Sequence, residues 1–388
     1  MLKRSWVLFV TGLIIAGISV GLAGCGSGSV SNEIKIGGNY EVTGSIASYA
    51  KSSTNGAKLA FKQANAAGGV LGKQINFVIA DNKSEPSEAA NAVTKLITQD
   101  KVVAIVGAIA SSNTLAGSPI AHANKIPFVS PISTNPRVTF ENGKLNDFAF
   151  RACFIDPFQG TVMASFATKS LKAKTAAIYI DNSSDYAKGL AQYFEESFVK
   201  SGGTIVAKEA YLQKDQDFRA TLTKIKATNP DVIFLPAYIE EGGKIAKQAR
   251  ELGLNVPILG GDGLDSPKLV EIAGSPDVLN NVFFSTHYSI DDKDPAALKF
   301  AEAYKKEYGE DPDMQAALGY DAASLVIDAI KRANSAAPEK IKEALAQTKD
   351  FPAVSGLITF DAQHNPVKSA VVIEIKNGKQ VFREKINP

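Results

Sequence analysis

The sequence contains few of the residues that most often carry catalytic or metal chemistry. Among its 388 residues there are two cysteines, three histidines and one tryptophan. The histidines, His122, His287 and His364, are too far apart in sequence for an HExxH motif or a compact histidine metal cluster. Beyond residue 24 the chain has neither a G-x-x-x-x-G-K-[ST] phosphate loop nor a G-x-S-x-G nucleophile elbow. The sequence therefore gives no support to an enzyme, and we expect no metal and no other cofactor.

An excess of charge of one sign is also lacking. The formal net charge is +2, from 42 basic and 40 acidic residues. Both surplus charges are Lys3 and Arg4, because residues 1–24 contain no acidic residue, and removing those two from 42 leaves 40, equal to the 40 acidic residues. Such a balanced chain lacks the basic footprint of a nucleic-acid-binding protein. We expect no nucleic acid among its partners.

The first 24 residues have the composition of an export signal. Two basic residues precede an apolar run over residues 6–22, which is typical of a secretory signal peptide. This run is nearly long enough to span a bilayer, so an uncleaved transmembrane anchor is the alternative. The segment Leu22-Ala23-Gly24-Cys25 resembles a bacterial lipobox, in which the cysteine becomes lipidated and forms the mature N-terminus. We expect a leader over residues 1–24 and a lipid on Cys25.

From this assignment we expect a lipid-anchored, extracytoplasmic protein, located at a Gram-positive cell surface or in a Gram-negative periplasm. Residues 25–32 are small and polar, as in a flexible tether. Cys153 then has no cysteine to pair with, so the folded part depends on its apolar core rather than on a disulfide. We interpret Cys153 as a small buried apolar residue and not as a nucleophile.

From residue 33 onward, short apolar runs alternate with longer amphipathic stretches. Helical periodicity is clear over residues 50–66 and 185–200. The runs that resemble strands are residues 34–38, 74–81, 102–107, 127–130, 175–181, 204–211, 231–236 and 256–260. Alternating strands and helices predict an α/β fold with parallel sheets covered by helices on both faces. The pattern resets near residues 146–157, which indicates two doubly wound lobes.

Polar residues follow two strands of the first lobe at their carboxyl ends, where ligands bind in open α/β sheets. Ser111 follows the strand at residues 102–107 and marks a helix start, where hydroxyl and backbone N–H groups stabilise an anion. Thr134 belongs to a second hydroxyl cluster, residues 130–134, after the next strand. The alternative is that Ser111 only caps its helix.

In the second lobe, Asp262 follows the strand at residues 256–260 between two glycines, which let the backbone approach a ligand closely. Its carboxylate is suited to a cationic group, and the alternative is a turn aspartate. Tyr49, Tyr186 and Tyr238 occupy comparable places after strands and can close over a small ligand. An anion site on one lobe and a carboxylate on the other fit a zwitterion.

Several segments together resemble the leucine/isoleucine/valine-binding family of ABC-transporter receptors. They are Gly44-Ser45-Ile46-Ala47-Ser48-Tyr49, Gly56-Ala57, residues 66–72, the Ser111 and Thr134 clusters, and Gly260-Gly261-Asp262-Gly263. The resemblance implies a type I periplasmic-binding-protein fold: two lobes joined by three hinge crossovers, near residues 151, 281 and 355. Lobe 1 would then comprise residues 33–151 and 282–355, and lobe 2 residues 152–281 and 356–388.

The resemblance also implies a function and a site. Ser111 and Thr134 match residues that bind a ligand α-carboxylate, the Ile132 carbonyl and Asp262 match acceptors of an α-ammonium, and the three tyrosines match aromatic residues that line the site. The function implied is capture of an α-amino acid, foremost a branched-chain one, by a monomer that delivers it to an ABC permease and ATPase complex. Gln315, at a position that faces the ligand in some members, indicates polar character and leaves non-aliphatic amino acids open as ligands. The alternative is a sensory or transport receptor for amides, urea or aromatic acids.

Overall fold

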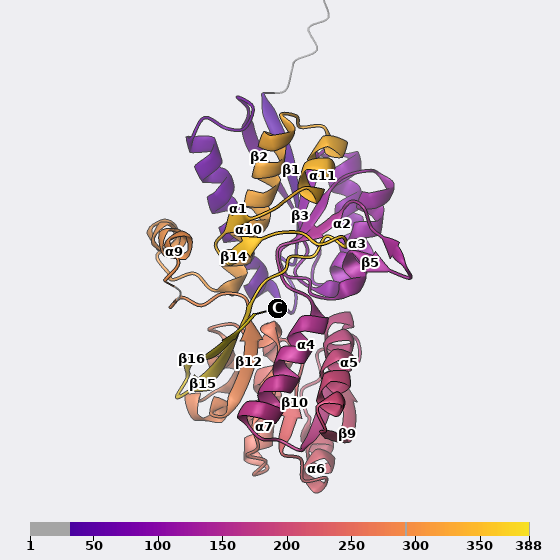
Figure 1. The fold of residues 1–388 in the computed structure, drawn as a ribbon, viewed down its shortest axis with the longest axis vertical. Coiled ribbons are helices and arrows are strands. Elements are labelled where there is room, and N and C mark those ends of the chain that lie inside the picture. The colour runs from indigo at the N-terminus through magenta and orange to yellow at the C-terminus, as the bar shows by residue number, and fades with distance from the viewer. Residues whose placement is uncertain (1–31, 292, 388) are drawn as a thin grey trace, which may run out of the picture. The chain divides into compact units, whose positions relative to one another are not determined.

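The structure is a computed structural model that describes residues 32–291 and 293–387. The leader, Cys25 and the tether as far as residue 31 lie outside the described residues. Residues 33–388 form one compact unit, which contains two helix-covered sheets (Figure 1). No helix in the described part of the chain is both long enough and apolar enough to cross a membrane.

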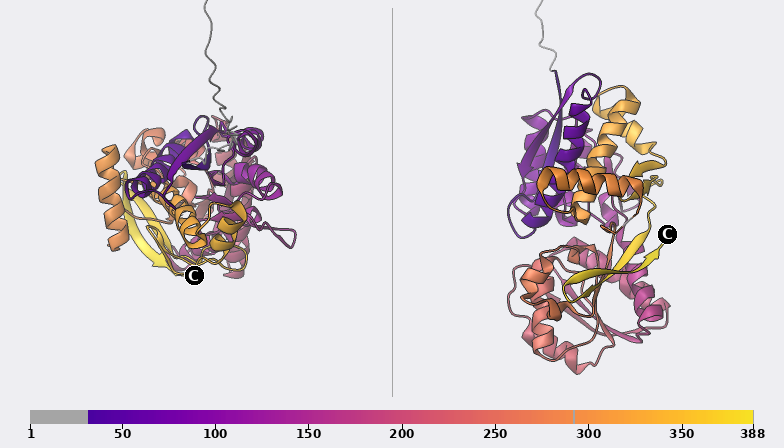
Figure 2. Two further views of the ribbon diagram at one scale, coloured as in Figure 1. Left: turned by 90° about the horizontal axis from the view of Figure 1, so that it is seen from above. Right: turned by 90° about the vertical axis from the view of Figure 1, so that its left-hand side faces the viewer.

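The first sheet has five parallel strands in the order β2-β1-β3-β4-β7. The strands are β1 (Glu33–Tyr40), β2 (Gln74–Asp81), β3 (Ala104–Gly107), β4 (Phe128–Ser130) and β7 (Ala149–Arg151). The helices of this lobe are α1 (Ala47–Ala66), α2 (Pro86–Thr98), α3 (Ser111–Ala123), α9 (Pro295–Tyr308), α10 (Met314–Ala333) and α11 (Pro338–Ala346). Helix α2 packs on α3, and α1 packs on α10, so that two segments far apart in sequence lie side by side (Figures 1 and 2).

The second sheet has seven strands in the order β16-β15-β12-β11-β10-β8-β9. Its parallel strands are β8 (Thr175–Asp181), β9 (Thr204–Tyr211), β10 (Val232–Phe234), β11 (Ile258–Gly260) and β12 (Val282–Thr286), and its antiparallel strands are β15 (Ala370–Lys376) and β16 (Lys379–Ile386). The helices are α4 (Asp156–Ser165), which continues into the π-helix η2 (Phe166–Ser170), α5 (Asp185–Lys200), α6 (Arg219–Ala227), α7 (Ile239–Glu251) and α8 (Leu269–Ala273).

Shorter elements complete the described chain. They are the 3-10 helices η1 (Pro136–Val138), η3 (Asp262–Leu264) and η4 (Pro276–Leu279), and the two-stranded pairs β5 (Phe140–Glu141) with β6 (Lys144–Leu145) and β13 (Phe351–Ala353) with β14 (Gly356–Ile358). Strands β5, β6, β7 and β13 were not predicted from the sequence. Each of these strands has only two or three residues, too few to establish a periodicity.

The strand sequences explain why both sheets are covered on their two faces. All residues of β3, β10, β11 and β12 are buried. A strand buried on both faces needs a continuous apolar run rather than alternation, which is the pattern of a parallel sheet inside helical layers. The helices meet this requirement from outside: Leu190, Phe194 and Phe198 of α5 are fully buried at helical spacing. The predicted doubly wound α/β architecture follows from these two patterns.

Two glycines set the close contact between α1 and α10. A Cβ atom on Gly56 would lie 1.9 Å from the Ala316 carbonyl oxygen, and one on Gly319 would lie 2.1 Å from the Ser53 carbonyl oxygen. Both distances are far below van der Waals contact, so only glycine permits this backbone approach. The Gly56-Ala57 motif is therefore a packing feature of lobe 1, and it fixes the helix that carries Tyr49.

The chain passes between the two sheets three times, and two of the expected boundaries differ from the structure. The first passage follows β7 and precedes α4. The second does not occur at residue 281, because β12 pairs with β11 in the second sheet and the chain leaves only after Thr286. The third does not occur at residue 355, since residues 356–366 stay with lobe 1: the Phe360 ring packs on Phe150, and His364 Nδ1 lies 3.0 Å from the Ala149 carbonyl oxygen. The second boundary therefore lies after residue 286 rather than at 281, and the third lies after residue 366 rather than at 355.

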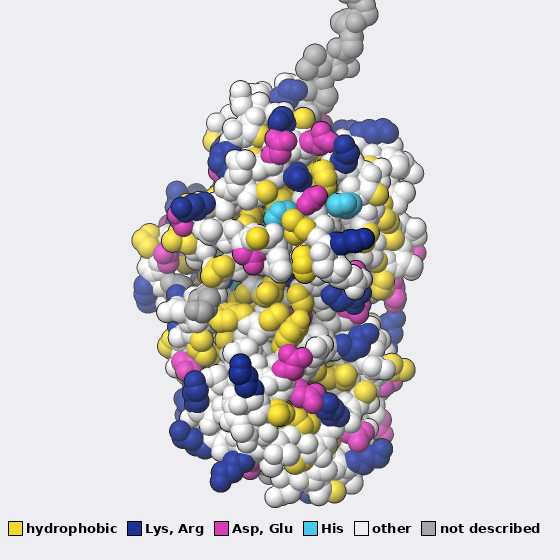
Figure 3. All heavy atoms as spheres, turned by 45° about the vertical axis from the view of Figure 1, so that its right-hand side comes forward, with side chains coloured by type: hydrophobic (Ala, Val, Ile, Leu, Met, Phe, Trp, Pro, Cys, Tyr) yellow, Lys and Arg dark blue, Asp and Glu magenta, His cyan; other side chains and the backbone are white. Residues whose placement is uncertain are grey.

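On the face in Figure 3, basic and acidic side chains are interspersed on both lobes, while apolar side chains gather at the level where the lobes meet.

Candidate ligand-binding site

One cavity between the lobes brings together all seven residues that the sequence indicated as ligand-binding. Its empty volume, including the part open to solvent, is about 310 Å³. Ile109 and Gln315 of lobe 1 and Gly263 of lobe 2 line it together with those seven, which are Tyr49, Ser111, Ile132, Thr134, Tyr186, Tyr238 and Asp262. The site therefore forms where the carboxyl ends of strands from both sheets face each other.

The lobe 1 side is built on the turn between β3 and α3. Thr114 N–H donates to the Ala110 carbonyl at 3.0 Å, which is the first intrahelical bond, so the preceding N–H groups have no helical partner. Glu41, fully buried, accepts the Ile109 and Ala110 N–H groups and the Asn113 amide. Burial raises the pKa of Glu41. The buried carboxyl side chain holds the turn in place, a role the sequence did not indicate.

Ser111 is the first residue of α3 and not its N-cap, which is Ala110. Its Oγ accepts the Asn135 N–H at 3.3 Å and thereby ties this helix to the segment after β4. Thr134 lies in that segment beside Asp156, but its hydroxyl makes no hydrogen bond of ordinary geometry to any described residue. The Thr134 hydroxyl lines the cavity and can donate to a ligand.

The lobe 2 side is the turn after β11, where η3 begins at Asp262. Gln159 Oε1 accepts the Asp262 N–H at 2.8 Å, and the Tyr186 hydroxyl accepts the Gly263 N–H at 3.1 Å. A Cβ on Gly261 would lie 2.6 Å from the Tyr186 hydroxyl oxygen, and one on Gly263 would lie 2.5 Å from the Ala237 carbonyl. The glycines are thus required for packing against protein neighbours, and Gly263 also lines the cavity.

The Asp262 side chain is 2% exposed, and its two carboxylate oxygens have different surroundings. Oδ2 lies 3.1 Å from His287 Nε2, whereas Oδ1 is buried without a hydrogen-bond partner among the described residues. His287 was not indicated as a site residue. His287 directly follows β12. The same signal that pointed to the other candidate residues, a polar residue at the carboxyl end of a strand, could have indicated it.

Three tyrosines cover the cavity from different elements. Tyr186 is the second residue of α5, and Tyr238 immediately precedes α7; their rings stack with centroids 5.3 Å apart and planes at 16°. Tyr49 of α1 meets Tyr238 edge-on at 6.1 Å. Burial raises the pKa of all three phenols well above 10, so they stay neutral and present ring faces and hydroxyl dipoles.

Tyr49 also joins the lobes directly. Its hydroxyl donates to the Gly263 carbonyl at 2.5 Å and accepts the Ile239 N–H at 3.0 Å. Gln315 Nε2, from α10, donates to the Asp265 carbonyl at 2.6 Å. Helices of lobe 1 are therefore hydrogen-bonded to lobe 2 backbone on the border of the cavity, as expected of a closed arrangement.

Two further carboxyl groups near Asp262 have raised pKa values because of their surroundings. Burial raises the pKa of Asp156 to about 8 and that of Asp265 to about 7, and the charge of Asp262 adds to both increases. Burial lowers the pKa of His287. Because Asp156 is mostly protonated and Asp265 is only partly ionised near neutral pH, the site combines the Asp262 carboxylate with N–H and hydroxyl donors on the opposite lobe.

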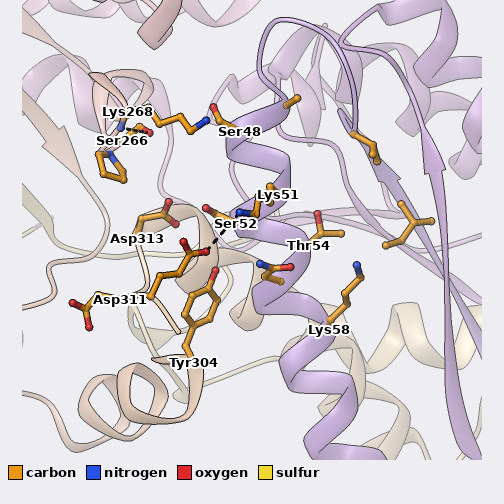
Figure 4. A pocket seen from close by; sticks show the side chains of 16 residues that line it. Ser48, Lys51, Ser52, Thr54, Lys58, Ser266, Lys268, Tyr304, Asp311 and Asp313 are labelled. Carbon is orange, nitrogen blue, oxygen red and sulfur yellow. Dashed lines mark hydrogen bonds and ion pairs between the residues drawn. The ribbon is translucent and has the colours of Figure 1, made fainter. Parts of the chain in front are cut away.

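A larger groove lies beside this cavity but is less suited to selective binding. Its empty volume is about 1500 Å³, and it lies between α1, the loop at residues 266–268 and the turn at residues 310–313 (Figure 4). An ion pair on its wall faces solvent: Lys51 and Glu310, 4.0 Å apart, are 71% and 52% exposed. Exposed pairs contribute little because water and salt screen them. None of the seven expected site residues lines this groove.

The described residues contain no group of three or more His, Cys, Asp and Glu side chains that could hold a metal ion. Cys153 is fully buried, and burial raises the pKa of its thiol to about 12. A thiol that stays protonated at neutral pH is a poor nucleophile. The full burial of Cys153 fits its interpretation as a core residue.

This chain is similar to known proteins over most of its described length. The family model described as "Periplasmic binding protein" matches residues 33–380. The branched-chain amino acid transporter substrate-binding protein LivJ from Streptococcus pneumoniae, solved in complex with isoleucine, is 42% identical; the match covers 92% of this chain and all of that chain, with a TM-score of 0.86. The leucine-binding protein LivK from Thermotoga maritima is 41% identical, with coverage of 92% and 99% and the same TM-score of 0.86.

Among curated sequences, the Leu/Ile/Val-binding protein BraC3 of Rhizobium johnstonii is 31% identical over 329 residues, which span 84% of this chain and 87% of that protein. The resemblance to leucine/isoleucine/valine-binding receptors is confirmed by these relatives, and the predicted type I fold with two lobes and three crossovers is confirmed as well. The chain belongs to the periplasmic binding protein family.

Proposed function

We propose that the protein is the extracytoplasmic substrate-binding component of an ABC importer and that it captures a branched-chain α-amino acid between its lobes. The observation that carries this proposal is the distribution of polar groups in the cavity. Lobe 1 offers the start of α3 with Ser111 and the Thr134 hydroxyl, and lobe 2 offers the unpartnered Oδ1 of Asp262. An α-carboxylate and an α-ammonium group satisfy these two sides at once.

The ligand's orientation follows from the same groups. The carboxylate lies against Ser111, Thr134 and the N–H groups of α3, and the ammonium group lies between Asp262 Oδ1 and the Ile132 carbonyl. The aliphatic side chain packs on Tyr49, Tyr186 and Tyr238, whose rings exclude water. The relatives LivJ and BraC3 are named for branched-chain substrates, which supports an aliphatic side chain.

Capture involves binding and closure without a chemical step. The open protein binds ligand on lobe 1, and closure then brings Asp262 and the Tyr49 contacts into place. The closed monomer is the form that the ABC permease and ATPase complex accepts. Cys25, outside the described residues, carries the lipid that keeps the receptor at the membrane surface after the leader over residues 1–24 is removed. Lobe 1 then comprises residues 33–151 and 287–366. Lobe 2 comprises residues 152–286 and those after residue 366.

A thermal-shift screen of the chain from Ser27 tests the proposal. Leucine, isoleucine and valine at about 100 times their dissociation constants should each add roughly 2.7 kcal/mol to the free energy of unfolding. Acetamide, urea and benzoate serve as the comparison set, because they lack the paired carboxylate and ammonium groups. Stabilisation by members of that set alone would replace the amino acid with an amide or aromatic acid as substrate.

A further inference from the structure

His287 is placed behind Asp262 by residues from several elements. Its side chain is 0% exposed, and its ring stacks on Phe154 with centroids 3.5 Å apart and planes at 24°. Phe154 belongs to the first crossover and His287 to the second, so the ring lies between two chain segments that join the lobes. This packing fixes the ring plane and therefore the direction of Nε2.

The hydrogen bonds available to the ring favour one protonation state. Nε2 lies 3.1 Å from the Asp262 carboxylate, which can only accept when ionised. Nδ1 is buried without a partner among the described residues, so a proton on Nδ1 would be an unsatisfied buried donor. The neutral tautomer with its proton on Nε2 avoids that cost, and burial also lowers the pKa of His287.

The loop that carries Asp262 is held by the same group of residues. Gln159 Oε1 accepts both the Asp262 N–H and the Ser285 hydroxyl at 2.8 Å. Backbone and carboxylate are thus anchored separately, the first by Gln159 and the second by His287. With Oδ2 engaged by the imidazole, Oδ1 is the oxygen left for a ligand.

We propose that His287 is a positioning residue for the substrate ammonium group: its Nε2–H holds Asp262 Oδ2 and thereby presents Oδ1 to the cavity. The inference rests on the proposed function, since it assigns His287 a part in the same site. A neutral imidazole adds no positive charge, so the negative charge of Asp262 remains available to the ligand. Lys368 is the cation that acts on His287 from the third crossover, and its own hydrogen bonds go to the Ala152 carbonyl and the Ser355 hydroxyl rather than to Asp262.

Isothermal titration of the purified protein with L-leucine tests this role through a donor-deleting and a donor-keeping variant. His287→Phe removes the Nε2–H, and the affinity for leucine should fall by about 10- to 100-fold, the usual loss of a hydrogen bond to a charged group. His287→Gln keeps an amide donor near the position of Nε2 and should remain within about threefold of the wild type. If the phenylalanine variant does not fold, His287→Met replaces it, because methionine is apolar and adapts to irregular space.

A double-mutant cycle with Asp262→Asn separates positioning from a purely structural role. If His287 acts through the carboxylate, adding His287→Phe to Asp262→Asn should cost less than about threefold more. His364→Phe is the matched control, since His364 also stacks on a phenylalanine, Phe150, and contacts a carbonyl, but lies outside the cavity. It should leave leucine affinity within about threefold of the wild type.

Three results would overturn the inference while the wild type binds leucine: unchanged affinity in His287→Phe, an equal loss in His287→Gln, or fully additive losses in the double variant. A wild type that binds none of leucine, isoleucine and valine would instead overturn the proposed function, and the inference with it.

Discussion

Replacing Asp262 by asparagine should abolish most of the affinity for a branched-chain amino acid while leaving the fold intact. The carboxylate is 2% exposed, and its Oδ1 has no partner among the described residues. Asparagine has nearly the same shape, so no cavity forms. Its amide can accept from His287 with its oxygen, but the amide N–H₂ then faces the ligand's ammonium group, which places donor against donor.

The magnitude follows from desolvation. Removing one partner of a buried charge pair typically costs about 3–5 kcal/mol, because the other charge is left uncompensated. The dissociation constant for leucine should therefore rise by roughly 10²–10³-fold. Isothermal titration measures this value, and circular dichroism checks that the variant is folded.

Asp265→Asn provides the matched control for this experiment. Asp265 is also buried and close to Asp262, but its carboxylate accepts from the Thr286 hydroxyl and from Gln380 at 2.7 Å, and it does not line the cavity. Its replacement should change leucine affinity by less than about fivefold. A dissociation constant of Asp262→Asn within about fivefold of the wild type would refute the ammonium assignment, as would an equal loss in the control.

The remaining predictions concern closure, specificity, packing and pH. Tyr49→Phe removes the hydroxyl that bonds the Gly263 carbonyl and the Ile239 N–H, so stopped-flow measurements should show leucine dissociating about 5- to 30-fold faster; an unchanged rate would contradict its role in closure. Gln315→Met removes a buried amide whose Oε1 is unpartnered, and should raise the affinity ratio of leucine to threonine, measured by competition; an unchanged ratio would exclude Gln315 from side-chain selection. Gly319→Ala places a methyl group 2.1 Å from the Ser53 carbonyl oxygen and should lower the melting temperature by several degrees, whereas an unaltered value would show that α1 and α10 can separate at little cost. Burial raises the pKa of Asp156 from 3.8 to about 8, so between these pH values the folded protein keeps a proton that the unfolded chain releases. The free energy of unfolding of the wild type therefore falls as the pH rises toward 8. Urea unfolding of Asp156→Asn should therefore show a gain over the wild type that is larger at pH 8.5 than at pH 5; a gain independent of pH would contradict the raised pKa.

Much of the architecture could be predicted because buried parallel strands and amphipathic helices have simple signatures. Strands β2, β8 and β9 and helix α5 have the bounds that periodicity indicated. The lobe boundaries could not be located so well. They depend on tertiary pairing, such as β12 with β11, and on contacts of Phe360 and His364 with lobe 1, which no local pattern encodes.

The site was predictable where its residues follow strands at the edge that faces the other lobe. Asp262, Ser111 and Thr134 were expected on this ground and all line the cavity, although Ser111 does not cap its helix. Glu41 and His287 lie at similar strand ends, but a lone buried acid or histidine has no distinctive spacing. Their roles depend on the partners that the fold supplies.

The most direct test of ligand capture is a crystal structure of the protein with L-leucine. The ammonium nitrogen should lie within hydrogen-bond distance of Asp262 Oδ1, and the carboxylate should lie at the start of α3 beside Ser111 and Thr134. The side chain should contact the three tyrosines. Leucine in the reversed orientation, or in the groove beside α1 instead, would contradict the proposed mode of binding.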